Sequence, residues 1–163
     1  MKKILIAILI MATIPIIGFS QSKVMDKLSD TYDDATVLVF YYSTLKMLIP
    51  EESTELRELI YNIEKIKVLM IDDLFDGKQE IDQIKEDLNN DGYDEAISIR
   101  HEENNIIVYI REKRGKTTGF FFLMEEDNGI TALDLVGEIA IDKLGLLTDQ
   151  LSILTEARNF SFN

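Results

Sequence analysis

Residues 106–136, IIVYIREKRGKTTGFFFLMEEDNGITALDLV, decide the fold class of this chain. The stretch holds three apolar runs of strand length, which are Ile106–Ile110, Phe120–Met124 and Ile130–Val136. The turn between the first two runs carries Gly115, and the next turn is Asn128-Gly129, a pair typical of tight β-hairpins. Ala96–His101 precedes them as a further strand-like segment. Together these segments predict a four-stranded antiparallel meander.

The first half of the chain alternates strand-like with helix-like segments. Thr36–Tyr42 is β-branched and aromatic, which predicts a buried strand, and Ile66–Ile71 predicts a second strand. After each strand, apolar residues recur at the spacing of an amphipathic helix. They are Leu56, Leu59, Ile60 and Ile63, and then Ile81, Ile84 and Leu88. A last stripe, Leu144, Leu147, Leu151 and Leu154, indicates a C-terminal helix.

The predicted fold class is therefore α+β. We expect one mixed sheet in the order β-α-β-α, followed by the four-stranded antiparallel meander and the C-terminal helix. The helices should pack mainly on one face of the sheet. The C-terminal leucine stripe would pack on the domain's own sheet, and a seam between two copies of the chain is the alternative.

Residues 1–20 have the layout of a secretory signal. The layout is a basic start, an apolar run and two small residues, formed by Lys2, Lys3, Ile4–Ile17, Gly18 and Ser20. The apolar run is shorter than the roughly 20 residues that span a bilayer, so a cleaved signal is favoured over a membrane anchor. We predict an exported bacterial protein of the periplasm or cell envelope, with full secretion as the alternative, and no transmembrane span after cleavage.

Cleavage before Gln21 would leave residues 21–163, the size of one domain with its own core. The chain has no cysteine, which excludes disulfides, thiolate metal sites and cysteine nucleophiles. Loss of Lys2 and Lys3 leaves 15 basic against 30 acidic residues, a net charge of −15. Such a surface repels phosphate backbones, so nucleic-acid binding is excluded as a function class.

Several segments of the second half occur in a familiar order. They are Asn90–Glu95, Ile106–Ile110, Glu112–Lys116 and Leu133–Ile139. In this order they resemble a family of small exported bacterial proteins classed as domain of unknown function 4252. The resemblance covers about residues 24–147. It implies a compartment and a fold, and it brings no activity, cofactor or catalytic residue.

The sharpest local chemistry is Asp87–Glu95, DLNNDGYDE, which matches the D-x-N-x-D-G start of a calcium loop. Its oxygen ligands would come from Asp87, Asn89, Asp91, the carbonyl of Tyr93, and Glu95. The twelfth position is Ser98, where an EF-hand requires a glutamate. The competing interpretation is structural, because Asn-Asp-Gly sequences are typical of turns. We predict no resident cofactor and keep calcium as the alternative.

Other candidate residues point less clearly to chemistry. His101 is the only histidine and lies beside two glutamates, with no second histidine to share a metal or a proton. In a strand, Phe121 must face away from Phe120 and Phe122. This favours a strand covered on both faces over one that exposes an aromatic side chain.

The sequence contains no phosphate loop, nucleophile elbow or paired histidines. We therefore predict a protein that is not an enzyme and that acts by contact with another envelope protein. One alternative is a calcium-binding module built on residues 87–95. The other is a domain that binds an apolar ligand between its sheet and its helices.

Overall fold

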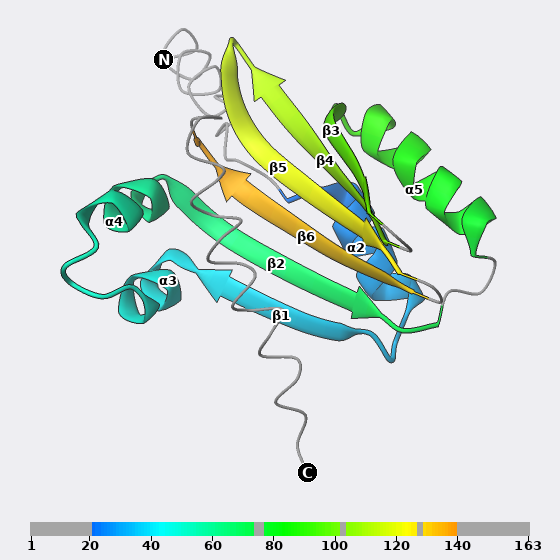
Figure 1. Ribbon diagram of the computed structural model, residues 1–163, viewed down its shortest axis with the longest axis horizontal. Coiled ribbons are helices and arrows are strands. Elements are labelled where there is room, and N and C mark those ends of the chain that lie inside the picture. Colours follow the sequence, from blue (N-terminus) through cyan, green and yellow to red (C-terminus); the bar gives the residue numbers. More distant parts are fainter. Residues whose placement is uncertain (1–20, 74–76, 102–103, 127–128, 140–163) are drawn as a thin grey trace, which may run out of the picture.

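The computed structural model describes residues 21–73, 77–101, 104–126 and 129–139. These residues form one six-stranded sheet with four helices (Figure 1). The strands are β1 (Thr36–Tyr41), β2 (Ile63–Ile71), β3 (Asp94–His101), β4 (Asn104–Lys113), β5 (Lys116–Glu125) and β6 (Ile130–Gly137). The helices are α2 (Lys23–Thr31), α3 (Tyr42–Leu48), α4 (Thr54–Tyr61) and α5 (Lys78–Asn90). The α+β class predicted from the sequence is confirmed.

The strands lie in the order β1-β2-β6-β5-β4-β3, and every neighbouring pair is antiparallel. The prediction of a mixed sheet is therefore wrong. A parallel β1-β2 pair would need a connection that runs back along the sheet. Helices α3 and α4 have only seven and eight residues, and they lie beyond the end of the sheet (Figure 1). Strand β2 therefore starts at the end where β1 stopped.

Helix α5 does cross back over the sheet, between β2 and β3. Its 13 residues extend about 20 Å at 1.5 Å per residue, so the helix runs back along much of the length of the strands. However, β2 and β3 are not neighbours, because β6, β5 and β4 lie between them. The crossover therefore creates no parallel pair.

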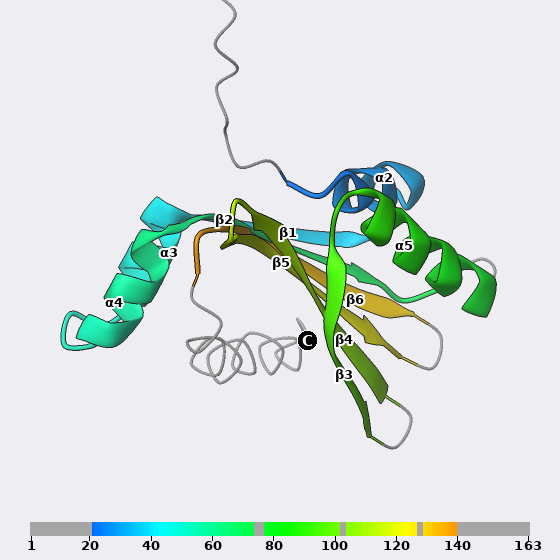
Figure 2. The ribbon, with the colours of Figure 1, turned by 90° about the horizontal axis from the view of Figure 1, so that it is seen from above.

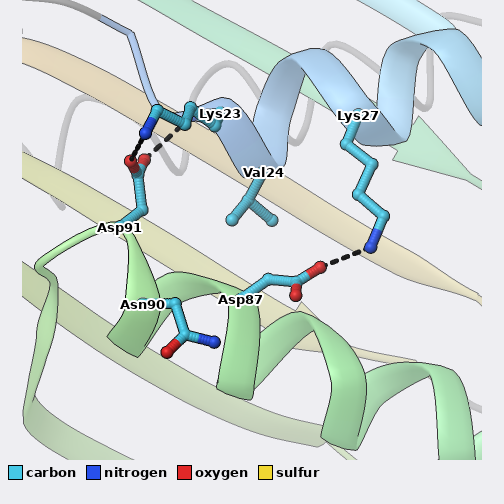
Figure 3. A pocket seen from close by; sticks show the side chains of 6 residues that line it. All are labelled: Lys23, Val24, Lys27, Asp87, Asn90 and Asp91. Carbon is cyan, nitrogen blue, oxygen red and sulfur yellow. Dashed lines mark hydrogen bonds and ion pairs between the residues drawn. The ribbon is translucent and has the colours of Figure 1, made fainter.

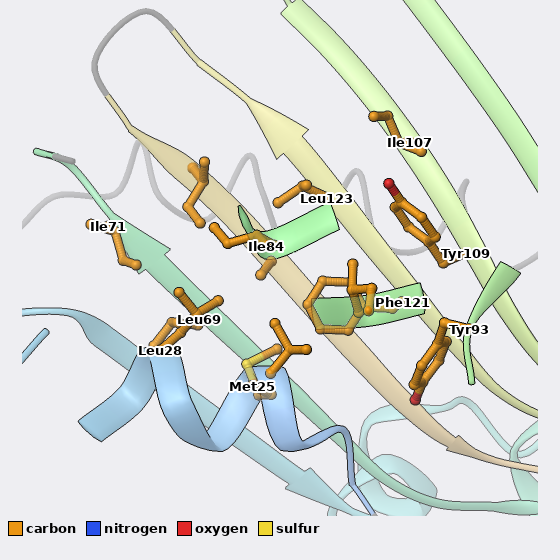
Figure 4. Close-up of a cluster of buried hydrophobic side chains, with 14 of the residues drawn as sticks. Met25, Leu28, Leu69, Ile71, Ile84, Tyr93, Ile107, Tyr109, Phe121 and Leu123 are labelled. Atoms are coloured by element: carbon orange, nitrogen blue, oxygen red, sulfur yellow. The ribbon is translucent and has the colours of Figure 1, made fainter. Parts of the chain in front are cut away.

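Helices α2 and α5 lie side by side on one face of the sheet (Figure 2). Between them and the sheet lies a cluster of buried side chains (Figure 4). It includes Met25 and Leu28 from α2, Ile84 from α5, and Leu69 and Phe121 from the sheet. Phe121 has no exposed surface, so the space between the helices and the sheet is filled at this point.

The opposite face of the sheet carries a second buried cluster. Phe120 and Leu135 belong to it, together with Leu59 and Ile60 of α4. Phe120 and Phe121 are therefore both buried, on opposite faces, while Phe122 is half-buried. This agrees with the expected alternation along the strand.

Strand β1 departs from its prediction. Thr36–Tyr42 was expected to form a buried strand, but β1 is an edge strand and most of its side chains are exposed. An apolar run in the sequence indicates a strand, but it does not indicate which strands will lie beside it. Here β1 pairs only with β2, so its other edge has no neighbouring strand among those described. The β-branched pattern was correct for secondary structure and wrong for burial.

Two further expectations concern longer segments. Within the part of the chain that the structure describes, no helix is long and apolar enough to span a membrane. The stripe Leu144, Leu147, Leu151 and Leu154 lies outside the described residues, as do residues 1–20. The C-terminal helix, the leader and the single-domain boundary at residue 21 therefore stay predictions.

Candidate functional site

The predicted calcium loop spans the end of α5 and the start of β3. Asp87 and Asn89 are still helical, and Asp91 caps the C-terminal end of α5. Gly92 then turns the chain with φ of 82°, in the left-handed region that favours glycine. Among the described residues, no group of three or more His, Cys, Asp or Glu side chains could hold a metal ion.

Two carboxylates of this segment have partners on α2. Asp87 accepts a hydrogen bond from Lys27 Nζ at 2.5 Å, and Asp91 accepts one from the backbone N–H of Lys23 at 2.9 Å. These groups line a groove of about 280 Å³ between α2 and α5 (Figure 3). The Lys27 ammonium lowers the pKa of Asp87. The charges of the groove are therefore largely neutralised within the protein.

The remaining predicted ligands point elsewhere. Glu95 is exposed on β3, across the strand pair from Tyr109. The side chain of Tyr93 is fully buried in the core under α2 and α5. The structure thus places Asp87 and Asp91 beside α2 and brings no third acidic ligand to them. Calcium binding at residues 87–95 stays a prediction, and the geometry adds no support to it.

Tyr93 leads to a site that the sequence analysis missed. Its hydroxyl donates a hydrogen bond to Asp134 Oδ1 at 3.1 Å. The other carboxylate oxygen of Asp134 accepts the backbone N–H of Ser22 at 2.7 Å. Asp134 and Ser22 have no exposed surface, so this is a buried polar cluster inside an apolar core.

Burial dominates the electrostatics of this cluster. It raises the pKa of Asp134, while the Ser22 N–H, the Tyr93 hydroxyl and the charge of Arg111 act in the opposite direction. Burial also raises the pKa of Tyr93 far above its usual range, and the neighbouring Asp134 adds to this effect. The tyrosine therefore stays protonated and can act as a hydrogen-bond donor.

Arg111 and Gly119 complete the surroundings of Tyr93. The guanidinium carbon of Arg111 lies 4.7 Å from the centre of the Tyr93 ring, a cation–π geometry. A Cβ atom at Gly119 would approach the Tyr93 hydroxyl to 3.1 Å and Arg111 Nη2 to 3.4 Å. Glycine is therefore the residue that leaves room for both side chains.

The cluster anchors the start of α2 to the middle of the sheet. The hydroxyl of Ser22 caps α2 by accepting the N–H groups of Val24 and Met25, while its own N–H goes to Asp134. One signal for this site was available in the sequence. Asp134 interrupts the apolar run Ile130–Val136 at a position that faces the core.

A second groove, of about 400 Å³, lies at the other end of α5. Lys85 on α5 and Glu125 on β5 form an ion pair beside it at 2.5 Å. Its lining includes Asp73, Lys78, Asp82 and Glu126, so it is not an apolar pocket. Neither groove described here supports the apolar-ligand hypothesis, which stays a prediction.

The only histidine of the sequence, His101, is the last residue of β3.

Exposed apolar side chains of the described residues are concentrated on β1 and on the two helices that follow it. Seven of the nine exposed large hydrophobic residues among those described lie on β1, α3 and α4. They are Val37, Leu38, Val39, Tyr41, Met47, Leu48 and Tyr61, and we call them the β1/α3/α4 surface. Met47 is 78% exposed and Tyr61 is 73% exposed, so this apolar area is presented to solvent. Because side chains alternate along a strand, Val37, Val39 and Tyr41 lie on one face of β1 and Leu38 lies on the other, so the exposed apolar groups flank this edge of the sheet on both faces. Exposed apolar groups gathered in one region typically mark contact sites.

The fold and these sites define a small α+β domain built on one antiparallel sheet. The chain belongs to the family described as domain of unknown function (DUF4252), whose signature matches residues 32–147. No curated protein and no solved structure matches the chain significantly. The matched region starts directly after α2 and includes all six strands.

Proposed function

We propose that this chain is an exported, non-enzymatic domain that acts by protein–protein interaction in the cell envelope through its β1/α3/α4 surface. The single observation that carries the proposal is the concentration of exposed apolar side chains on β1, α3 and α4. Leu38, Tyr41 and Met47 would each lose exposed apolar area on contact, which contributes about 25 cal/mol per Å².

The charge of the chain supports contact at this surface. The net charge of the chain is −13, whereas β1 itself, TVLVFY, has no charged residue. A partner that approaches β1 therefore meets apolar side chains and open backbone groups with little desolvation of charge. Interfaces with few charges at their centre are typical of protein–protein contacts.

The arrangement of the carboxylates supports a non-enzymatic role. Asp134 is the one fully buried acid in the part of the chain that the structure describes, and its oxygens are held by Ser22 and Tyr93, away from any solvent-exposed substrate. Asp87 and Asp91 are held by the two lysines of α2. A general base must reach a substrate, and these three groups instead connect elements of the fold.

The experiment places a photoreactive amino acid at position 39 on β1 and, in a matched variant, at position 99 on β3. Val39 is 40% exposed and Ile99 is 50% exposed, and both lie on edge strands. We expect irradiation of cells to give a defined crosslinked species only from position 39. Equal labelling from both positions, or none from position 39, would contradict binding through this surface.

Two further measurements address the compartment and the absence of activity. Mass spectrometry of the envelope fraction should find the chain starting at Gln21, and a cytosolic chain that retains Lys2 would contradict export. A panel of hydrolase and transferase substrates should give no turnover. Turnover that disappears on substitution of a single carboxylate would contradict the non-enzymatic role.

A further inference from the structure

The two edges of the sheet differ in their protection against pairing with another strand. Edge strand β3, DEAISIRH, carries exposed Asp94, Glu95 and Arg100, and its register with β4 shifts between Glu95 and Ile97. Charges and bulges of this kind discourage edge-to-edge pairing. Strand β1 has neither, because it is uncharged and pairs with β2 without a register shift.

An open β1 edge offers backbone N–H and C=O groups that no described strand satisfies on its outer side. A partner strand that pairs there must also tolerate an acidic molecule. For a second copy of this chain, most surfaces are repulsive, since each copy has a net charge of −13. The uncharged β1 edge is the place where two copies can approach without opposing charges at the contact.

Resting on the proposed function, we propose that the partner of this surface is a second copy of the chain, paired antiparallel through β1 across a two-fold axis. Residues that lie opposite each other in an antiparallel pair point to the same face of the sheet. In a symmetric β1-β1 pair, one residue of β1 must therefore lie opposite its own copy, and the two-fold axis passes beside that residue. With the axis at Leu38, Val37 faces Val39 of the second copy. With the axis at Val39, Leu38 faces Phe40 instead. Both arrangements bring apolar side chains together and join two sheets into one of twelve strands.

The ends of β1 also complement each other under this symmetry. Asp33 and Asp34 precede the strand, and Lys65 of β2 lies opposite Tyr41 at its other end. An antiparallel second copy brings the acidic start of one β1 toward the Lys65 end of the other. The two-fold symmetry produces this acidic-to-basic contact at both ends of the β1-β1 pair, in a closed dimer.

Single cysteines give a direct test, because the chain contains none of its own. A residue beside the two-fold axis faces itself at the Cα separation of a disulfide. We expect either Leu38→Cys or Val39→Cys to form a covalent dimer in a mild oxidising buffer, and the more reactive position identifies the axis. Ile99→Cys, on the protected edge, is the matched control and should stay monomeric. The proposal is overturned if neither β1 position crosslinks in preference to Ile99→Cys.

Charge substitutions test the same contact without a covalent bond. Val39→Glu is compatible with the fold of one copy, since Lys67 lies opposite Val39 on β2. In the dimer it places two like charges near the axis, which should weaken association at least about tenfold. Ile99→Glu is the control and should leave association unchanged. Sedimentation equilibrium measures both, and a circular dichroism melt verifies that each variant is folded.

The outcomes separate this inference from the proposed function. A wild-type chain that stays monomeric at all attainable concentrations overturns self-pairing. If position 39 still crosslinks to a different protein in cells, the proposed function stands without it. The inference is supported directly if the wild-type chain is a dimer that dissociates on Val39→Glu substitution and stays intact on Ile99→Glu substitution.

Discussion

The hydroxyl of Tyr93 donates a hydrogen bond to Asp134 Oδ1 at 3.1 Å, although 41 residues separate the two in the sequence. Tyr93 directly follows the turn after α5, and Asp134 lies in the middle of β6. The second carboxylate oxygen binds the N–H of Ser22 at the start of α2. One buried carboxylate thus connects the sheet to the ends of both covering helices.

Removal of the tyrosine hydroxyl should therefore destabilise the fold. Tyr93→Phe keeps the ring in the core but leaves Asp134 with one fewer donor, which should lower the free energy of unfolding by about 1–3 kcal/mol. Urea denaturation followed by circular dichroism measures the change. Tyr61→Phe removes the same atom from a side chain that is 73% exposed and serves as control. Equal effects of the two substitutions would contradict a stabilising role of the bond.

The raised pKa of Asp134 predicts a pH dependence of stability. Between the pKa of Asp134 in the unfolded chain, about 4, and its higher pKa in the folded protein, the folded state holds a proton that the unfolded state has lost. In this window the contribution of Asp134 to the free energy of unfolding falls as pH rises, by up to about 1.4 kcal/mol per pH unit. Asp134→Asn lacks this group.

The difference in unfolding free energy between wild type and Asp134→Asn should therefore decrease from acidic to neutral pH. Urea titrations at several pH values give this difference directly, and effects of the other carboxylates cancel between the two chains. If the unfolding free energies of the two proteins change in parallel across the whole pH range, burial does not shift the pKa of Asp134.

A side chain at Gly119 should destabilise the fold because it would crowd the hydroxyl of Tyr93. Gly119→Ala places a methyl group 3.1 Å from the Tyr93 hydroxyl, and overpacking of this kind costs about 1–3 kcal/mol. In a Tyr93→Phe background this hydroxyl is absent, so the same substitution should cost less. A double-mutant cycle of unfolding free energies measures the coupling. Additive effects would place the constraint elsewhere.

Calcium provides a test of the loop at residues 87–95. We expect thermal melts in millimolar calcium and in chelator to coincide, because Lys27 and Lys23 already hold Asp87 and Asp91. A bound ion at 100 times its Kd would instead stabilise the fold by about 2.7 kcal/mol. A calcium shift that Asp91→Ala abolishes would establish the site despite these contacts.

The second half of the fold was predictable because its signals are local. The turn residues around Gly115 and Asn128-Gly129 separate runs of strand length, and β4, β5 and β6 pair successively as expected. Opposite burial of Phe120 and Phe121 follows from the two-residue period of a strand. These features depend on neighbours in the chain, so the sequence alone determined them.

Only the tertiary structure decided the sheet neighbours and the buried polar cluster. The apolar composition of β1 gave a strand but could not show that it lies at an edge, since burial depends on which distant strand pairs with it. The antiparallel β1-β2 pair depends on where α3 and α4 lie, and not on their spacing of apolar residues. The role of Asp134 depends on Ser22 and Tyr93, which are 112 and 41 residues away. The polar residue inside the apolar run of β6 signals a buried acid, but nothing near it in the sequence identifies these partners.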